Sequence, residues 1–456
     1  MWAEAGVTAR FQRGSTSGER PPQPTSAPVM PLAEAVAGQR TFDVVVDFVH
    51  DPRVLTLCAR TRFGVWRLDA FASGAGYREA FEEAPVTPVV LTVQQSAEEP
   101  PRVVARVDHD TKFPASRHHA FLREKAVPLV MRELARLHQD GAVQDLGLAE
   151  PRPSPSARSH VPRYLTRWGG EVVQRFKRAA GARLGRRYGG FYLKIGRGTP
   201  HTFDPAAAQS VMPPSHAFWA DPFLFETEDG LYVFYEDYDY RTGLGHIAVA
   251  RTDGDRFDVI GDALRRPYHL SFPFVFRWNG DIWMIPETIQ AARIEVWRAR
   301  AFPLEWELVA TALEGTRAAD TVLAVHENAW WVFTNIFGDI FDDYSGELHV
   351  YRADSPLLRR LEPHPLNPVV VGSCTARNGG RVFHENGRLY RTSQENSHGT
   401  YGYGLNVMEI TALDLTCYEE TRVRRITPDF EPGIIGCHHC DAAAGVVVFD
   451  VRAALF

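Results

Sequence analysis

Cysteine is scarce in this sequence, with only five residues in a chain of 456: Cys58, Cys374, Cys417, Cys437 and Cys440. So sparse and odd a set argues against a disulfide-stapled scaffold. Long apolar runs are also missing, because charged residues interrupt every apolar stretch before the roughly 20 residues that a membrane-spanning helix needs. The lack of long apolar runs argues against a membrane-spanning protein.

A net positive charge is absent as well. The formal charge is −6 and the isoelectric point is about 6.3, so a whole-protein basic field for nucleic acid is lacking and no nucleic-acid partner is expected. The first 40 residues have no basic start followed by an apolar core, which is the pattern of a signal peptide. A cytoplasmic location is therefore expected.

The composition is otherwise that of a globular protein, with 45% hydrophobic and 23% charged residues, and the aromatic content of 11% suits β-structure or a carbohydrate site. Changes in composition along the chain predict four segments. These are a disordered tail (1–40), a small α/β domain (41–145), a basic linker with a helix (146–198) and a repetitive β domain (199–456).

The linker is a basic island on an acidic protein. Residues 151–200 hold twelve Lys or Arg and a single acid, Glu171. One interpretation is that residues 158–187 bind an anionic membrane surface, which would make the protein membrane-peripheral. The alternative is a solvated linker helix.

The last segment repeats one pattern five times, beginning near residues 220, 271, 319, 379 and 436. Each unit reads as an apolar strand, a polar turn such as TEDG, WNGD, HENA or ENGR, and an apolar or aromatic strand, usually followed by a further strand. A period of about 50 to 60 residues with this content is typical of propeller blades. The predicted fold is mainly β: a five-bladed β-propeller with a small N-terminal α/β domain. The segment FYLKIGRG (191–198) is expected to supply an outer strand that closes the ring.

Alignment of the units brings acidic residues to matching places. The innermost strands begin at Asp221, Phe272, Asp320 and Gly380, and fifteen residues later come Glu236, Glu287, Asn335 and Glu395. Equivalent positions in successive blades surround one axis. Carboxylates of several blades are therefore expected to converge at one end of a central channel.

Several of these stretches also carry a family resemblance: ADPFLF (220–225), LSFPFVF (270–276), IPET (285–288), ADTVLA (319–324), RNGGRVF (377–383) and RLYRTSQENSHGTYGYGL (388–405). They resemble the N-terminal domain of the plant glucosamine inositolphosphorylceramide transferases and its bacterial relatives. That domain is itself similar to furanosidase propellers such as glycoside hydrolase family 43. The resemblance covers about residues 200–456. It implies a carbohydrate-active protein of bacterial glycan metabolism and polysaccharide biosynthesis, acting on a carbohydrate or a glycan precursor.

A second resemblance concerns residues 41–140. The runs DVVVDFVH and FGVWRLDAF resemble the back half of a formyltransferase-like domain. The front half, with its folate-facing motif, has no counterpart before residue 41. The domain is interpreted as a degenerate scaffold without formyl transfer.

Cleavage of a glycosidic bond needs a general acid and a base or nucleophile. The resemblance implies that Asp221 is the base, and Glu287 is our candidate for the acid. Phe272 stands where the second blade of the related furanosidases carries an Asp, so Asp320 is the candidate for the third catalytic carboxylate. The substrate-binding candidates are Glu236, Arg377, Gln394, Glu395, Tyr401 and His438. The ordinary alternative is that Asp at a strand start makes only turn hydrogen bonds.

The run CHHC (437–440) invites a zinc interpretation, but zinc sites commonly use two separated ligand pairs. Strand alternation would also place Cys437 and His439 on one face, with His438 and Cys440 on the other. No metal and no cofactor are therefore expected.

The sequence leaves open whether the chain is an enzyme. If it is one, a glycosidase or a glycosyl-transferring enzyme is expected. The alternative is a noncatalytic glycan-binding or scaffold propeller that works with a separate glycosyltransferase, as Phe272 and the degenerate N-terminal domain suggest. A protein-binding propeller is the third possibility, which the clustered acids disfavour because protein binding does not require them around an axis.

Overall fold

The computed structural model describes residues 30–149, 162, 164–170, 173, 190–336, 338, 341 and 343–454. The chain divides into two compact units, Met1–Gly170 and Glu171–Phe456. Most of the basic segment 158–187 lies outside the described residues, and so does most of the tail 1–40. Within that tail, Leu32–Ala37 form the short helix α2.

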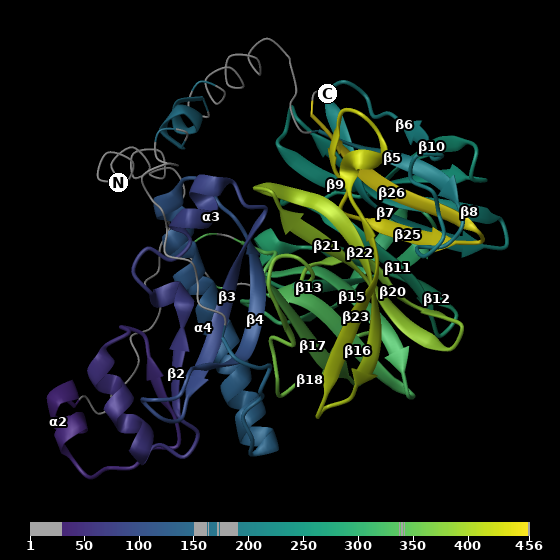
Figure 1. Ribbon diagram of the computed structural model, residues 1–456. Helices are drawn as coiled ribbons and strands as arrows, with labels where there is room; N and C mark the ends of the chain where they lie inside the picture. Colours follow the sequence, from purple (N-terminus) through teal and green to yellow (C-terminus); the bar gives the residue numbers. More distant parts are fainter. Residues whose placement is uncertain are drawn as a thin grey trace. The chain divides into compact units, whose positions relative to one another are not determined.

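The N-terminal unit is a four-stranded sheet with one long helix (Figure 1). The strands run in the order β1-β2-β3-β4, with β1 parallel to β2 and the other pairs antiparallel. Their bounds are β1 Val45–Asp47, β2 Val65–Leu68, β3 Val86–Gln94 and β4 Arg102–Asp110, followed by helix α4, Ala115–Asp140. The remaining helical turns are η1 Pro52–Arg60, η2 Asp69–Phe71 and α3 Tyr77–Glu82.

Two elements of this unit differ from what their sequences predict. The apolar run TFDVVVDFVH (41–50) predicts a buried strand, but the strand β1 comprises Val45–Asp47 alone and lies at the edge of the sheet. The apolar spacing of residues 121–135 predicts a helix there, but α4 is longer, because Pro114 precedes its first residue and Gly141 caps its end in the left-handed conformation.

The C-terminal unit contains five successive antiparallel sheets. The first is β7 Ala217–Thr227, β8 Gly230–Asp239, β9 Leu244–Thr252 and β10 Phe257–Leu264; the second is β11 Ser271–Trp278, β12 Asp281–Glu287, β13 Ile294–Ala301 and β14 Glu305–Ala312, with the turn η3 Ile289–Ala291. The third is β15 Ala318–His326, β16 Ala329–Ile336, β17 Glu347–Ala353, β18 Leu361–Pro363 and β19 Val370–Val371; the fourth is β20 Asn378–Glu385, β21 Arg388–Ser397, β22 Thr400–Leu413 and β23 Tyr418–Ile426. The fifth is β24 Ile434–Gly436, β25 Cys440–Ala443, β26 Val446–Ala453, β5 Phe191–Arg197 and β6 Gln209–Val211, preceded by the turn η4 Pro428–Phe430.

The repeated hairpins expected from the sequence are present. The pairs β7–β8, β11–β12, β15–β16, β20–β21 and β25–β26 are antiparallel neighbours. Their polar turns place Asn279, Asn328 and Asn386 at positive φ, a conformation that Asn tolerates better than most residues. Turn chemistry and alternating apolar residues therefore specified these elements locally.

The fifth sheet joins the two ends of the unit. Strand β5 pairs with β26 along its whole length, with Lys194 opposite Phe449, so residues 191–197 form the added strand that the sequence suggested. Phe203, Phe449 and Val451 pack in one apolar cluster, and Ile195 packs with Val448 in another. The interlocked strands hold the start and the end of the unit together.

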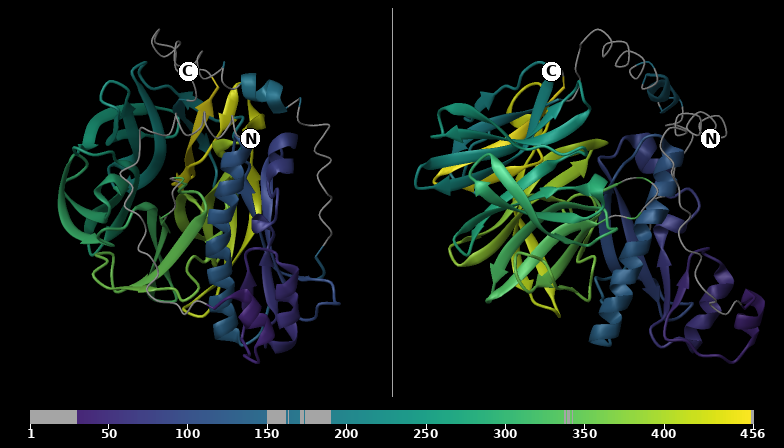
Figure 2. Two further views of the ribbon diagram at one scale, coloured as in Figure 1. Left: turned by 90° about the vertical axis from the view of Figure 1, so that its left-hand side faces the viewer. Right: turned by 180° about the vertical axis from the view of Figure 1, so that it is seen from behind.

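The first strand of each sheet's hairpin contacts its counterparts in neighbouring sheets (Figures 1 and 2). Strand β7 contacts β11, β11 contacts β15, β15 contacts β20, β20 contacts β25, and β25 contacts β7. Large apolar clusters fill the space between successive sheets. Residues at equivalent places on these five inner strands are thereby brought close together.

A bulge interrupts each of the first three inner strands at the same place. Asp221, Phe272 and Asp320 have φ of 50°, 47° and 49°, and the ladder slips there by one residue. The fourth inner strand carries Gly380 at its bulge, where an added Cβ would lie 2.1 Å from the carbonyl oxygen of Cys440. A bulge re-aims side chains, here toward the neighbouring inner strands.

All five cysteines lie among the described residues, and none of them forms a disulfide bond. Among the described helices, none is long and apolar enough to cross a membrane.

Candidate functional site

The acids of the first three sheets lie together at the bulged ends of the inner strands. Asp221 and Asp320 occupy bulges. Glu236 pairs with Ala220, the residue before the bulge at Asp221, and Glu287 pairs with Ser271, the residue before the bulge at Phe272. All four carboxyl groups are buried. The predicted convergence of Asp221, Glu236, Glu287 and Asp320 is therefore present, and we call these residues the acid cluster.

One member of the cluster is held in an ion pair. Nε of Arg377 donates to Oδ2 of Asp320 (2.6 Å), and Nη2 donates to Oδ1 (3.3 Å). Gln394 also donates from Nε2 to Oδ2 of Asp320 (3.3 Å). The Arg377 guanidinium lies over the ring of Tyr401, 5.0 Å from its centroid. Asp320 is thus fixed as a charged carboxylate, and the predicted residues Arg377, Gln394 and Tyr401 surround it.

Glu287 lies beside this ion pair but is not hydrogen-bonded to Arg377. Its Oε2 is 3.7 Å from Nη2 of Arg377 and has no hydrogen-bond partner among the described residues. Burial and the negative charge of Asp320 raise the pKa of Glu287 well above its ordinary value, and the charge of Arg377 offsets this only in part. The surroundings of Glu287 therefore favour its protonated form.

Asp221 is linked to the last sheet through a histidine. Nε2 of His438 lies 3.4 Å from Oδ1 of Asp221, and Nδ1 of His438 is hydrogen-bonded to Oδ1 of Asp450 at 2.7 Å. Burial raises the pKa of Asp221 to about 7, helped by the charges of Asp450 and Asp320 and opposed by that of His438. Burial acts against the charged forms of His438 and Asp450, but their mutual attraction raises the pKa of the first and lowers that of the second.

Asp450 was not singled out by the sequence. It is fully buried and also accepts hydrogen bonds from the backbone N–H of Asp221, His438 and His439. The available signal was an acid within the apolar run VVVFDV (446–451), which a buried strand carries only when the acid has partners.

Glu236 completes the cluster on its other side. Its Oε1 is 3.3 Å from Nε2 of His269 but has no hydrogen-bond partner in the described parts of the chain. Burial, Asp221 and Glu287 raise the pKa of Glu236 well above its ordinary value.

Glu395 does not join the cluster. It was aligned with Glu236 and Glu287, but the place before the bulge in the fourth sheet belongs to Ser393, which pairs with Asn378. The Glu395 carboxylate instead accepts hydrogen bonds from Nε and Nη2 of Arg425 at 2.5 and 2.6 Å. A bulge one residue longer than the others shifted the register, so the alignment of Glu395 is corrected.

The CHHC run is divided among three environments. Cys437 and Cys440 share one apolar cluster, so the expected strict alternation is wrong. His438 faces the acids, whereas His439 packs edge-on against Phe223 and Phe272, and burial lowers its pKa to about 3. Irregular backbone between β24 and β25 breaks the alternation.

One group of residues offers metal-ligand geometry: atoms of Asp221, His438 and Asp450 lie within 4.8 Å of one another. The hydrogen bonds already described occupy both oxygens of Asp450 and Nδ1 of His438. We therefore interpret the trio as a hydrogen-bonded array.

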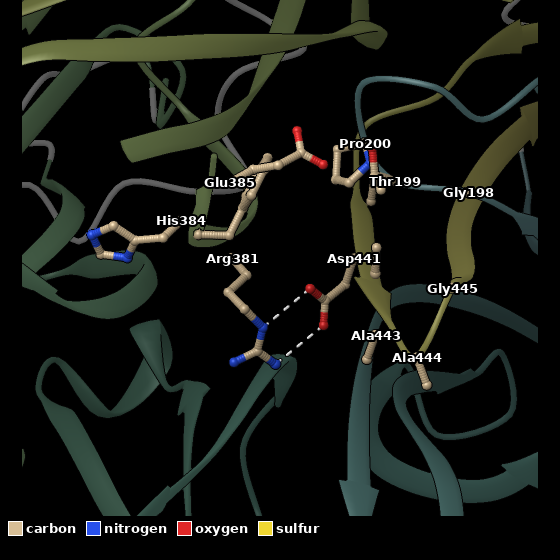
Figure 3. A pocket seen from close by; sticks show the side chains of 13 residues that line it. Gly198, Thr199, Pro200, Arg381, His384, Glu385, Asp441, Ala443, Ala444 and Gly445 are labelled. Carbon is tan, nitrogen blue, oxygen red and sulfur yellow. Dashed lines mark hydrogen bonds and ion pairs between the residues drawn. The ribbon is translucent and has the colours of Figure 1, made fainter. Parts of the chain in front are cut away.

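A pocket of about 230 Å³ lies at the opposite ends of the inner strands, lined by residues such as Arg381, Glu385 and Asp441 (Figure 3). Arg381 donates to both oxygens of Asp441 and to the carbonyl oxygens of Leu224 and Val275. This cation thus ties four sheets together. Its donors serve the fold, so the acid cluster is the stronger candidate site.

Comparison with known proteins bears on residues 203–431, which match the family model described as glucosamine inositolphosphorylceramide transferase 1, N-terminal. The relative of that name from Arabidopsis thaliana is 36% identical over 210 residues, covering 45% of this chain and 27% of the relative. The relative from Oryza sativa subsp. japonica is 35% identical over 234 residues, covering 49% and 31%. The chain thus spans less than a third of the length of either relative.

Among solved structures, an α-L-arabinofuranosidase from Lactobacillus brevis is 15% identical with a TM-score of 0.36, covering 51% of this chain and 82% of that one. A thermostable family-43 glycoside hydrolase is 13% identical with a TM-score of 0.39, covering 53% and 91%. The match to the family model extends over half of the sequence and includes the whole acid cluster with Arg377. The chain therefore belongs to the family of the N-terminal domain of glucosamine inositolphosphorylceramide transferase 1.

Proposed function

We propose that the C-terminal unit is a five-bladed β-propeller that cleaves or transfers a glycosyl unit at the acid cluster. The five successive sheets, the cyclic contacts of their inner strands and the strand β5 that joins both ends support the propeller assignment. Family membership supports a carbohydrate-related function.

One observation carries the proposal: neighbouring buried carboxyl groups have different surroundings. Asp320 is held by Arg377, Glu287 keeps an oxygen without a hydrogen-bond partner among the described residues and has a pKa raised well above its ordinary value, and the pKa of Asp221 is raised to about 7. Glycosyl chemistry needs such a pair, one group to give a proton and one to accept it. A purely structural cluster of acids would instead be expected to satisfy every oxygen with a donor.

In the proposed reaction, Glu287 gives its proton to the oxygen of the leaving group. Asp221 accepts the proton of the attacking water or acceptor hydroxyl. Arg377 fixes Asp320 beside Glu287, and the negative charge of Asp320 keeps Glu287 protonated until the bond breaks. His438 holds Asp221 from the other side and limits how far burial raises its pKa.

A noncatalytic glycan-binding or scaffold propeller is the second candidate. Phe272, fully buried against Phe223 and His439, occupies the bulge where a further carboxylate was expected. An apolar group at this place favours a site that binds a sugar without converting it. In either case we propose that the chain serves polysaccharide biosynthesis inside the cell.

A crystal soak with mono- and disaccharides tests the proposal. The panel includes glucosamine, the sugar in the name of the plant relatives, because its ammonium group would pair with a buried carboxylate. Sugar density between Asp221 and Glu287, together with turnover lost in Glu287→Gln, is the expected result. Density there with no turnover of nitrophenyl glycosides or activated sugar donors would favour the binding module, and no density would contradict the site.

A further inference from the structure

The least satisfied part of the acid cluster is the contact between Glu236 and His269. Glu236 is 5% exposed, and its Oε1 lacks a hydrogen-bond partner within the described chain although Nε2 of His269 is 3.3 Å away. Burial disfavours an ionised Glu236 carboxylate, and the negative charges of Asp221, Glu287, Asp450 and Asp237 disfavour it further, so its pKa is raised well above its ordinary value. The surroundings therefore favour the neutral carboxyl group.

The backbone fixes the tautomer of His269. The N–H of Gly245 donates to Nδ1 of His269 at 2.9 Å, so Nδ1 carries no proton. A neutral ring must then carry its proton on Nε2, the nitrogen that faces Glu236. Burial lowers the pKa of His269 to about 4, which keeps the ring neutral at physiological pH.

Gly245 is what allows these groups to approach. A Cβ at this position would lie 2.6 Å from Oε1 of Glu236 and 2.7 Å from Cε1 of His269. Gly245 therefore acts on the Glu236–His269 pair in two ways: its N–H binds the imidazole, and its lack of a side chain leaves room for both groups.

We propose that Glu236 and His269 form a charge-neutral subsite for a sugar hydroxyl, in which Glu236 is a protonated carboxylic acid and His269 is the Nε2–H tautomer. The carbonyl oxygen of the acid accepts a hydrogen bond, while its O–H and the imidazole N–H donate. A hydroxyl group, which donates one bond and accepts two, matches this set without bringing charge into a buried site. This subsite rests on the proposed function. It adds that a sugar hydroxyl binds at the Glu236–His269 side of the acid cluster, whereas the Asp320–Arg377 ion pair lies at the other side.

The protonation state is read by infrared spectroscopy of the full chain with ¹³C-carboxyl-labelled glutamate. At pH 7, the wild-type-minus-E236Q difference is expected to contain the band of a protonated carboxyl group. E395Q is the matched control, because Glu395 is equally buried but paired with Arg425, and its difference is expected to contain carboxylate bands. Carboxylate bands in the E236Q difference would overturn the proposal on their own.

The ligand is tested by calorimetric titration with glucose and glucosamine. E236Q, whose amide also donates and accepts, is expected to keep the wild-type affinity within about threefold, whereas E236L is expected to lose about tenfold or more. D255N, in the exposed Arg197–Asp255 pair outside the acid cluster, should bind as the wild type does. Should E236L fail to fold, E236D, which withdraws the carboxyl group by one methylene, is expected to show the same loss.

A loss in E236Q as large as in E236L would mean that the subsite needs a charge, and would overturn the proposal. Full binding by both E236L and E236D would also overturn it. Failure of the wild type to bind either sugar would contradict the proposed function and remove the ligand of this subsite, whatever the infrared spectra show.

Discussion

Arg377 and Arg381 are four residues apart at the start of the fourth sheet, and each forms an ion pair with a buried aspartate, but the two pairs differ in function. Arg381 binds Asp441 and two backbone carbonyl oxygens, so its charge is fully used in tying sheets together. Arg377 binds Asp320 but leaves Glu287 beside it with an unpartnered oxygen among the described residues. In a structural ion pair, every donor and acceptor has a partner within the protein. At a functional site, some polar atoms beside the pair lack such a partner and can bind a ligand.

The largest effect is expected from a substitution beside Arg377 that removes a reacting group. Glu287→Gln removes the proposed general acid, so turnover of a substrate identified from the panel should fall about 100- to 10,000-fold. Stability should respond differently, because the raised pKa of Glu287 means that folding opposes its ionisation. That penalty is absent below the unfolded pKa and grows as pH rises toward the folded pKa. The variant should therefore match the wild type at pH 4 and be more stable at pH 8 in urea titrations; equal turnover would contradict the role.

The next largest effect is expected on stability, from a substitution of Arg381. Arg381→Met leaves Asp441 buried without its cation and frees two carbonyl oxygens, which should cost about 3–5 kcal/mol of unfolding free energy. Urea denaturation followed by tryptophan fluorescence measures it. Under conditions where the variant is folded, sugar binding at the acid cluster should persist. Lost binding by a folded protein would mean that the two ends are coupled.

A smaller effect sharpens the electrostatics of the site. Because the pKa of Asp221 is about 7, turnover should decline as pH falls through about 7 and Asp221 takes up a proton. His438 lowers that pKa, so in His438→Gln the acidic limb should move to higher pH. The pH dependence of kcat/KM measures both. A limb unmoved in the variant would show that His438 does not act on Asp221.

The smallest effect is expected from a solvent-exposed ion pair, which serves as a reference for the Arg381–Asp441 pair. Arg197 and Asp255 are 2.8 Å apart but more than half exposed. Asp255→Asn should change the unfolding free energy by less than about 1 kcal/mol, because water screens the pair. A loss as large as that of Arg381→Met would show that burial does not distinguish the pairs.

Much of the fold was predictable because its determinants are local. The turn WNGD and its flanking apolar residues specify a hairpin without reference to the rest of the chain, and the same holds for the other units. The matching places of Asp221 and Asp320 followed from that repeat. The exact length of a strand such as β1 did not, because pairing at a sheet edge depends on its neighbour.

The candidate site was predictable only in part. Repeat alignment brought Asp221, Glu236 and Glu287 together correctly, since each lies a fixed number of residues from a hairpin turn. It placed Glu395 wrongly, because one additional bulge residue in β20 shifts the register of β21. Asp450 could not be assigned by any spacing, because its partner Asp221 comes from β7 and its partner His438 from the irregular segment between β24 and β25.

The sequence by itself determined the repeated hairpins, the apolar strands and the family to which residues 203–431 belong, because these depend on neighbours along the chain. Only the tertiary structure decided which acid is paired and which is left open. Charge state depends on burial and on groups from other sheets: Asp320 meets Arg377, while Glu236 meets a histidine whose tautomer the backbone of Gly245 has fixed.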